Sequence, residues 1–316
     1  MDLFNRLRNT DDILLHYYPL HSALMDWGKD LESHLSEWIC THKEIYQEAL
    51  LKSYEAGCDF CSTSTQAASP WRAAVFGLRH KVHEHNYLSA KWAKEVTPPE
   101  RYVAGFVSST NPDFLQPVGN LTPEEVRDGY KEQISALLEG GVDLIMVVGN
   151  QLDASVIAIH VAKSLSNLPV IAQNVFYRGK KGYRTLMGHD PVTASRTLQD
   201  AGADVVGASC GLMKRSEDSS DPRSYFQFAT SLVQEIRSSC TVPVSIQPNA
   251  GLAQNVEGKT VYPATPDELA EAGPEWVEAG ARIIGGCCGT SLEHYRKLRR
   301  AIEALGKERS SSGLRS

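Results

Sequence analysis

Three of the seven cysteines stand where a metal site could form. Cys210 closes an apolar run, and Cys287 and Cys288 lie within Gly285–Gly289, which reads Gly-Gly-Cys-Cys-Gly. Thiolates are preferred zinc ligands, and three protein ligands with one open position are typical of catalytic zinc. Glycines crowded around paired thiols make little sense as core packing. We therefore predict that Cys210, Cys287 and Cys288 bind one Zn²⁺ ion.

The adjacent pair imposes a geometric condition on this site. Neighbouring side chains in a β-strand point to opposite faces, so Cys287 and Cys288 could not share an ion inside a regular strand. The flanking glycines allow backbone angles that other residues avoid, so the pleat can break there. We expect both sulfurs to turn to the same side and to face Cys210.

The remaining cysteines are Cys40, Cys58, Cys61 and Cys240. An odd number of cysteines in a long chain without a secretion signal argues against a disulfide framework. Cys58 and Cys61 have the Cys-x-x-Cys spacing, but they precede or open a strand and no second pair accompanies them. We interpret these four cysteines as core thiols.

The elements that must position the cysteines follow a repeated pattern of a helix, a glycine and a short apolar strand. The glycines are Gly57, Gly141, Gly202 and Gly280. Each is predicted to take the left-handed conformation at the C-terminus of a helix, after which the chain turns into a buried strand.

Eight strands are expected, near residues 12, 59, 103, 143, 169, 204, 243 and 282, and helical periodicity follows them, as over 36–56 and 122–138. Apolar strands that alternate with helices indicate a parallel sheet covered by helices. Eight such units predict a closed (β/α)8 TIM barrel, whose active site lies at the carboxyl ends of the strands. The glycine motifs of nucleotide-binding open sheets are absent from the sequence. We expect one domain over residues 1–306 and a disordered tail over residues 307–316.

Composition limits the classes of partner. The formal net charge of −6 over 316 residues provides no basic surface for nucleic acid or for an anionic membrane. The sequence has no apolar run of about 18 residues, and its first residues lack the apolar region of a signal peptide. We expect a cytoplasmic protein without nucleic-acid or membrane partners, and a homo-oligomer is compatible with the sequence.

The sequence resembles the homocysteine S-methyltransferase family over nearly the whole chain. Gly285–Gly289 is similar to the family's last zinc motif, and Gly207–Cys210 is similar to its Gly-x-Asn-Cys motif, with Ser209 in place of asparagine. Gln247–Gly251 is similar to its Tyr-Pro-Asn-Ala-Gly segment. The resemblance implies a zinc-binding barrel that methylates a thiol. It also implies a catalytic role for Asn249, which would occupy or support the open zinc position.

Two departures from the family concern the substrate. Family members have Asp-Gly-x-x-Gly-Thr after the first strand and Glu-Thr at the end of the fourth, whereas this chain has His-Tyr-Tyr-Pro-Leu-His at 16–21 and Val-Val-Gly-Asn-Gln at 147–151. A buried ammonium without its carboxylate partner costs about 2–5 kcal/mol. We infer that the metal chemistry is kept and the substrate is changed. The candidate substrate-binding residues are His16, Tyr17, His21, Asn150, Gln151 and Asn174.

The expected function is zinc-dependent transfer of a methyl group to a small-molecule thiol, either homocysteine or a related thiol. Candidate methyl donors are a small sulfonium, a quaternary amine and a separate methyl-corrinoid protein. One alternative is methyl exchange between a small substrate and a corrinoid protein. A second is zinc-activated water for hydrolysis or lyase chemistry, which needs a general base that no strand end supplies. A third is a catalytically silent barrel that acts as a binding subunit.

Overall fold

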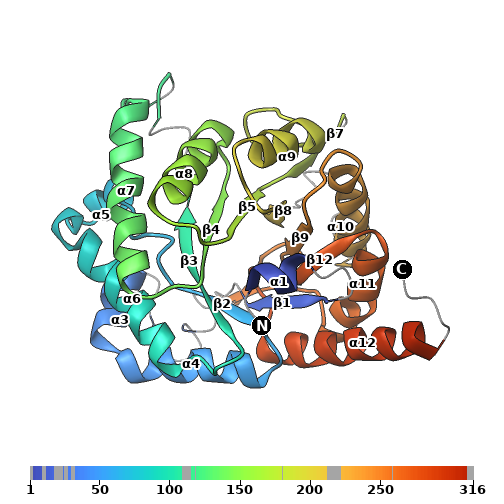
Figure 1. Ribbon diagram of the computed structural model, residues 1–316. Helices are drawn as coiled ribbons and strands as arrows, with labels where there is room; N and C mark the ends of the chain where they lie inside the picture. Colours follow the sequence, from blue (N-terminus) through green and yellow to red (C-terminus); the bar gives the residue numbers. More distant parts are fainter. Residues whose placement is uncertain are drawn as a thin grey trace.

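A computed structural model of the chain describes residues 3–8, 12–17, 24, 28–29, 33–108, 115–117, 119–179, 181–211, 222–257 and 259–311. Eight parallel strands close into a barrel in the order β1-β12-β9-β8-β5-β4-β3-β2 (Figure 1). These strands are β1 (Leu14–Tyr17), β2 (Phe60–Ser62), β3 (Tyr102–Ser108), β4 (Leu144–Gly149), β5 (Val170–Asn174), β8 (Val205–Cys210), β9 (Val244–Pro248) and β12 (Ala281–Gly286). The predicted single-domain (β/α)8 barrel is confirmed.

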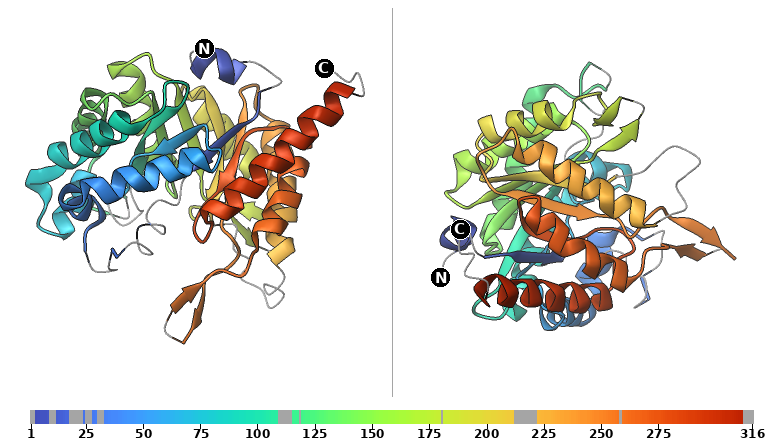
Figure 2. Two further views of the ribbon diagram at one scale, coloured as in Figure 1. Left: turned by 90° about the horizontal axis from the view of Figure 1, so that it is seen from below. Right: turned by 90° about the vertical axis from the view of Figure 1, so that its right-hand side faces the viewer.

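Helices surround this barrel on its outer side and cover its amino end (Figures 1 and 2). They are α1 (Leu3–Arg8), α3 (Leu35–Thr41), α4 (Lys43–Glu55), α5 (Pro70–Val75), the 3-10 helix η1 (Arg79–Lys81), α6 (Val82–Val96), α7 (Pro123–Glu139), α8 (Leu152–Leu165), α9 (Pro191–Asp200), α10 (Pro222–Arg237), α11 (Pro266–Glu278) and α12 (Leu292–Ser311). Among these described helices, none is both long enough and apolar enough to cross a membrane.

Strand alternation divides the core into two layers. Alternate strand residues such as Phe60, Met146 and Ile171 pack together inside the barrel. The residues between them, such as Ile145 and Ala172, pack outward against the helices. This division explains why the strands are apolar on both faces, and it identifies which side chain of each strand can reach the interior.

The helix ends largely follow the predicted signals. Gly57, Gly141, Gly202 and Gly280 all have positive φ, between 88° and 109°. Thr122 caps α7 through a reciprocal capping box with Glu125.

Two boundaries differ from the sequence-based expectation. The periodic segment 36–56 is divided between α3 and α4, because Thr41 Oγ1 and His42 Nδ1 both lie 2.9 Å from the carbonyl oxygen of Trp38, where the helix would otherwise continue. Helix α12 extends through Ser311, five residues beyond the expected end of the domain. Lys307, Glu308 and Arg309 are good helix formers and prolong it. Residues 312–316 lie outside the described residues.

Two β-hairpins were not predicted. Strands β6 (Tyr177–Gly179) and β7 (Gly182–Arg184) follow β5, and β10 (Gln254–Val256) and β11 (Lys259–Val261) follow β9. Both therefore belong to the carboxyl end of the barrel, and Figure 2 shows the β10–β11 hairpin projecting from the body. These short strands carry few apolar residues, so alternation in the sequence did not reveal them.

Helix α1 closes the amino end of the barrel, where Leu3 and Leu7 join the inner core. The buried carboxylate of Asp59 ties this end together. It accepts hydrogen bonds from Arg6 at 3.1 Å, from Arg101 at 2.6 Å and from Arg299, and its Oδ2 atom also accepts from the backbone N–H of Leu15 at 2.8 Å. One carboxylate thus connects α1, β1, the residue before β3 and α12.

We predict that Asp59→Asn lowers the free energy of unfolding by about 3 kcal/mol, because three arginines lose the anion on which they converge. Denaturant unfolding would measure this loss. Asp143→Asn is the matched control: Asp143 binds a single lysine, Lys94, and the backbone N–H of Val103. Its substitution should cost about 1 kcal/mol. Equal losses for the two variants would contradict the assigned role of Asp59.

Candidate functional site

The sulfur atoms of Cys210, Cys287 and Cys288 lie within 4.8 Å of one another at the carboxyl end of the barrel. Cys210 ends β8, and the other two follow β12, with β9 between these strands. The Cys210 and Cys287 sulfurs lie in direct contact, with their Cα atoms 5.6 Å apart. Within the described residues, no other group of three histidine, cysteine or acidic side chains is close enough to share a metal ion.

The end of β9 holds the segment that carries the adjacent cysteines. The N–H of Cys287 donates to the carbonyl of Pro248 at 2.8 Å, and the N–H of Cys288 donates to Asn249 Oδ1 at 3.1 Å. The N–H of Ala250 returns a bond to the carbonyl of Cys288 at 2.9 Å. Because β12 ends at Gly286, the cysteines lie past the regular pleat, and both sulfurs face the same point.

Unusual backbone angles occur on both sides of the cluster. Cys210 has φ of +53°, which a residue with a side chain rarely adopts. Gly289 has φ of +83°, and a Cβ atom there would lie 2.1 Å from the ring of Tyr262. The glycine is therefore required, since it lets the chain turn immediately after Cys288.

Tyr262 contacts the cluster from the base of the β10–β11 hairpin. Burial raises the pKa of the Tyr262 hydroxyl to about 12, and the neighbouring Cys288 adds to this shift. Burial also raises the pKa of the Cys288 thiol, while the Tyr262 hydroxyl opposes that shift. Tyr262 was not among the predicted site residues, because nothing in the sequence indicates that this loop folds back over the cysteines.

The adjacent sulfurs of the cluster have the spacing of two ligands on one tetrahedral metal ion. With Zn–S bonds of about 2.3 Å, two thiolates on one tetrahedral ion lie about 3.8 Å apart. The sulfurs of Cys287 and Cys288 are 3.9 Å apart. An all-sulfur donor set favours zinc over magnesium or calcium. Since a metal ion binds thiolates, the site corresponds to the reduced form of Cys210 and Cys287.

His16 lies in the barrel interior, fully buried and stacked on Phe60 with ring centroids 4.3 Å apart. Its Nε2 atom is 2.7 Å from Ser62 Oγ, and its Nδ1 atom is 2.5 Å from Gln247 Nε2. Because the amide nitrogen is a donor, Nδ1 accepts and Nε2 carries the proton. Burial lowers the pKa of His16 to about 3, so the ring is neutral at pH 7.

The other predicted site residues occupy more varied positions. Asn249 contacts the cysteine segment directly. Asn150 Oδ1 accepts from Tyr177 at 3.3 Å, and Gln151 is the N-cap residue of α8. Asn174 is buried with both amide atoms unpaired, and strand alternation directs it away from Gln173, whose side chain enters the interior. The side chain of Tyr17 and the whole of His21 lie outside the described residues.

The remaining cysteines match their interpretation as core thiols in three of four cases. Cys58, Cys61 and Cys240 are buried, and Cys40 is partly exposed on α3. Burial raises the pKa of Cys58 well above its usual range.

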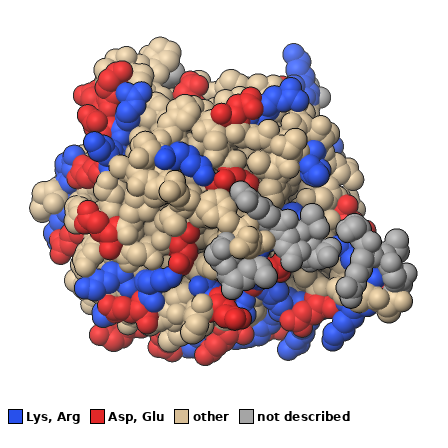
Figure 3. All heavy atoms as spheres, in the orientation of Figure 1, with Lys and Arg blue, Asp and Glu red and all other residues tan. Residues whose placement is uncertain are grey.

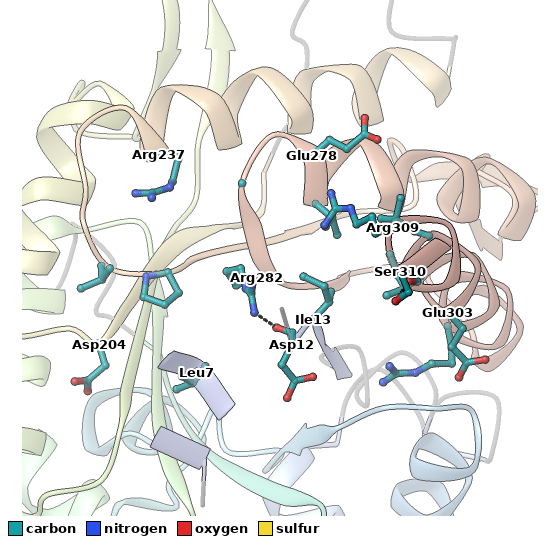
Figure 4. A pocket seen from close by; sticks show the side chains of 18 of the residues that line it. Leu7, Asp12, Ile13, Asp204, Arg237, Glu278, Arg282, Glu303, Arg309 and Ser310 are labelled. Atoms are coloured by element: carbon teal, nitrogen blue, oxygen red, sulfur yellow. Dashed lines mark hydrogen bonds between the residues drawn. The ribbon is translucent and has the colours of Figure 1, made fainter. Parts of the chain in front are cut away.

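A large cavity of the described structure is elsewhere. It has a volume of about 1490 Å³ and lies at the amino end of the barrel, against α1 and α12. Figure 4 shows Asp12, Asp204 and Glu278 around it together with Arg237 and Arg282. Acidic and basic groups also intermix among the described residues of this face of the molecule (Figure 3). The cavity is therefore separated from the cysteines by the length of the barrel. Its lining contains both acidic and basic side chains, so neither sign of charge predominates.

We predict a pH dependence of stability from His16. The pKa of His16 is about 3 in the folded chain and about 6.5 in the unfolded chain. Below pH 6.5 the imidazole is therefore protonated in the unfolded chain but stays neutral in the folded chain, which favours unfolding. The folded state has its full stability with respect to His16 above pH 6.5, and this part of the free energy of unfolding is lost as the pH falls toward 3. Between pH 7 and pH 5 the protein should lose about 2 kcal/mol more stability than the His16→Gln variant. Denaturant unfolding at both pH values would measure the two losses. An equal loss of unfolding free energy in the wild type and in His16→Gln would contradict the prediction.

The comparisons with known proteins agree with this architecture. The family model described as "Homocysteine S-methyltransferase" matches residues 16–302. Methionine synthase of Mycobacterium leprae is 28% identical over 276 residues, which are 83% of this chain and 21% of that protein. The chain therefore spans about a fifth of the length of this relative.

Solved structures show the same fold. The metallated form of the homocysteine methyltransferase MmuM from Escherichia coli has a TM-score of 0.73 at 20% identity, covering 94% of this chain and 99% of that one. Its oxidized form has a TM-score of 0.72 at 19% identity, covering 94% and 97%. Since the family model covers most of the chain, this protein belongs to the homocysteine S-methyltransferase family.

Proposed function

We propose that this protein is a zinc-dependent S-methyltransferase that acts on a small-molecule thiol. The convergence of Cys210, Cys287 and Cys288 within 4.8 Å carries the proposal, together with membership of the family. Three cysteines leave one position of a tetrahedral ion free for the substrate sulfur.

Bound zinc would supply a Lewis acid that deprotonates the substrate thiol, of which only a few per cent is ionised at pH 7 in solution. The chain would contribute the charge around the ion: three cysteine thiolates would outweigh its two positive charges and leave the substrate sulfur electron-rich. In the transfer, the sulfur forms a bond to the methyl carbon. The bond between this carbon and the donor breaks, and the donor keeps the electron pair.

Hydrogen bonds from the polypeptide hold the metal-binding cysteines in place. Asn249 and Pro248 hold the backbone of the cysteine segment, so Asn249 supports the open position through Cys288. His16, Tyr17, His21, Asn150, Gln151 and Asn174 remain the proposed substrate-binding residues. Homocysteine is one candidate substrate, since the family and MmuM are described by it.

Methyl exchange with a separate corrinoid protein is the second candidate. The relative named methionine synthase is about five times longer than the matched segment, so this chain matches one part of a larger protein. In this second candidate function, the methyl group is exchanged with a separate molecule. That molecule is either a small sulfonium or quaternary amine, or a protein.

We expect the reduced protein to contain about one zinc ion per chain, and the Cys287→Ser variant to contain less than about a tenth of that, because one of three thiolates is lost. Elemental analysis after purification with a reductant would measure both. Cys40→Ser is the control and should keep its zinc, since Cys40 lies outside the cluster. A reduced wild-type protein without metal would favour a silent binding subunit instead.

Asn249→Ala should weaken zinc binding about tenfold, because groups that orient metal ligands typically contribute this much to affinity. The N–H of Cys288 would lose its acceptor. Asn249→Asp keeps an acceptor oxygen and should stay within about threefold of the wild type. Competition with a chromophoric chelator gives the affinities. If alanine and aspartate have the same effect, the hydrogen bond to Cys288 is not the reason for the presence of Asn249.

A further inference from the structure

The barrel strands contain almost no charge. Among the residues of the eight strands, none is Asp, Glu or Lys, and the single arginine is Arg282. Arg282 lies at the amino end, where it donates to the backbone carbonyl of Asp12. The strands therefore offer no charged partner to a ligand that enters the interior from the carboxyl end, where the cysteines lie.

Neutral hydrogen-bonding groups occupy the interior instead. His16 is linked to Ser62 and Gln247, and Gln173 Nε2 donates to Gln247 Oε1 at 2.8 Å and to Ser245 Oγ at 2.9 Å. All five side chains are buried. The network crosses the barrel from β2 and β1 to β9 and β5.

Two atoms of this interior have no hydrogen-bond partner. Gln173 Oε1 and Ser209 Oγ are buried and unpaired, and the two residues are 1% and 0% exposed. They lie on the neighbouring strands β5 and β8. Ser209 directly precedes Cys210 and lies opposite Gln247 in the register of β8 and β9. Ser209 shares the inward face of Val205, because strand residues two apart point the same way.

An unpaired buried acceptor and an unpaired buried hydroxyl near the carboxyl ends of β5 and β8 indicate a missing hydrogen-bonding partner. A hydroxyl or a primary amide can donate to Gln173 Oε1 and accept from Ser209 Oγ. An ammonium or a carboxylate would give up its hydration without finding an opposite charge on any barrel strand.

We propose that the barrel interior beside the cysteines binds an uncharged polar group of the thiol substrate, through Gln173 Oε1 and Ser209 Oγ. The substrate class is then a thiol that carries a hydroxyl or amide, rather than an ammonium, near its sulfur. This inference rests on the proposed function, because it places the substrate sulfur at the cysteine cluster.

Three thiols of equal chain length test the proposal: 2-mercaptoethanol, cysteamine and 1-propanethiol, which end in a hydroxyl, an ammonium and a methyl group. Cobalt(II) would replace zinc in the reduced full-length protein, and the sulfur-to-cobalt absorption band would be titrated with each thiol. After correction for the pKa of each thiol, 2-mercaptoethanol should bind at least tenfold more tightly than cysteamine and more tightly than 1-propanethiol.

Ser209→Ala is the first variant, and it should fold normally because its hydroxyl has no partner to lose. It should reduce the preference for 2-mercaptoethanol over 1-propanethiol at least threefold. Ser195→Ala is the matched control, since Ser195 is an equally buried, unpaired serine on α9, outside the barrel. It should leave the preference unchanged.

Gln173→Glu is the second variant. It introduces a carboxylate and should shift the preference toward cysteamine at least tenfold. Should this buried charge prevent folding, Ser209→Ala still decides the question.

The outcomes separate the two proposals. Cobalt spectra that change with cysteamine as readily as with 2-mercaptoethanol, or a Ser209→Ala variant with the wild-type preference, would overturn the inference and leave the proposed function intact. Spectra that change with none of the thiols would overturn the proposed function, and the inference with it.

Discussion

The end of β9 makes three hydrogen bonds to the segment after β12, and the geometry of the cysteine site depends on them. Adjacent residues of a strand would direct Cys287 and Cys288 to opposite faces. The segment escapes this rule because β12 stops at Gly286 and the chain turns at Gly289, while Pro248, Asn249 and Ala250 hold its backbone. Cys210 then reaches the same point from β8, on the other side of β9. A closed barrel supplies this arrangement, since each strand end is fixed by both neighbours.

The two ends of the barrel are built from different chemistry. At the amino end, a buried carboxylate gathers three arginines, and acidic and basic groups line a broad cavity. At the carboxyl end, thiols stand above an interior of amides, hydroxyls and a neutral imidazole. At the amino end, where no reaction is proposed, ion pairs thus connect helices and strands. The proposed reaction site combines sulfur ligands with neutral hydrogen bonds.

His16 illustrates how burial decides the character of a side chain. In water a histidine exchanges protons near neutral pH, whereas in this interior desolvation keeps the ring uncharged over the physiological range. Its hydrogen bonds to Ser62 and Gln247 then fix one tautomer. A neutral, oriented imidazole belongs with the amides around it, and the whole network behaves as a polar but uncharged surface. This is the physical basis for expecting the substrate to present an uncharged group there.

The sequence by itself determined the barrel and the cysteine trio, because both rest on local signals. These signals are the glycines after helices, the apolar strands and the Gly-Gly-Cys-Cys-Gly run. Each indicates a local conformation that depends mainly on neighbouring residues in the chain. The tertiary structure alone decided what surrounds the cysteines. Tyr262 comes from the loop after β11 and lies against Cys288. Gln173 and Ser62 come from distant strands, and their link through Gln247 and His16 depends on register around the closed sheet. The same register turns Gln173 inward and directs Asn174 away, a choice that period-two alternation leaves undetermined until one residue of the strand is placed.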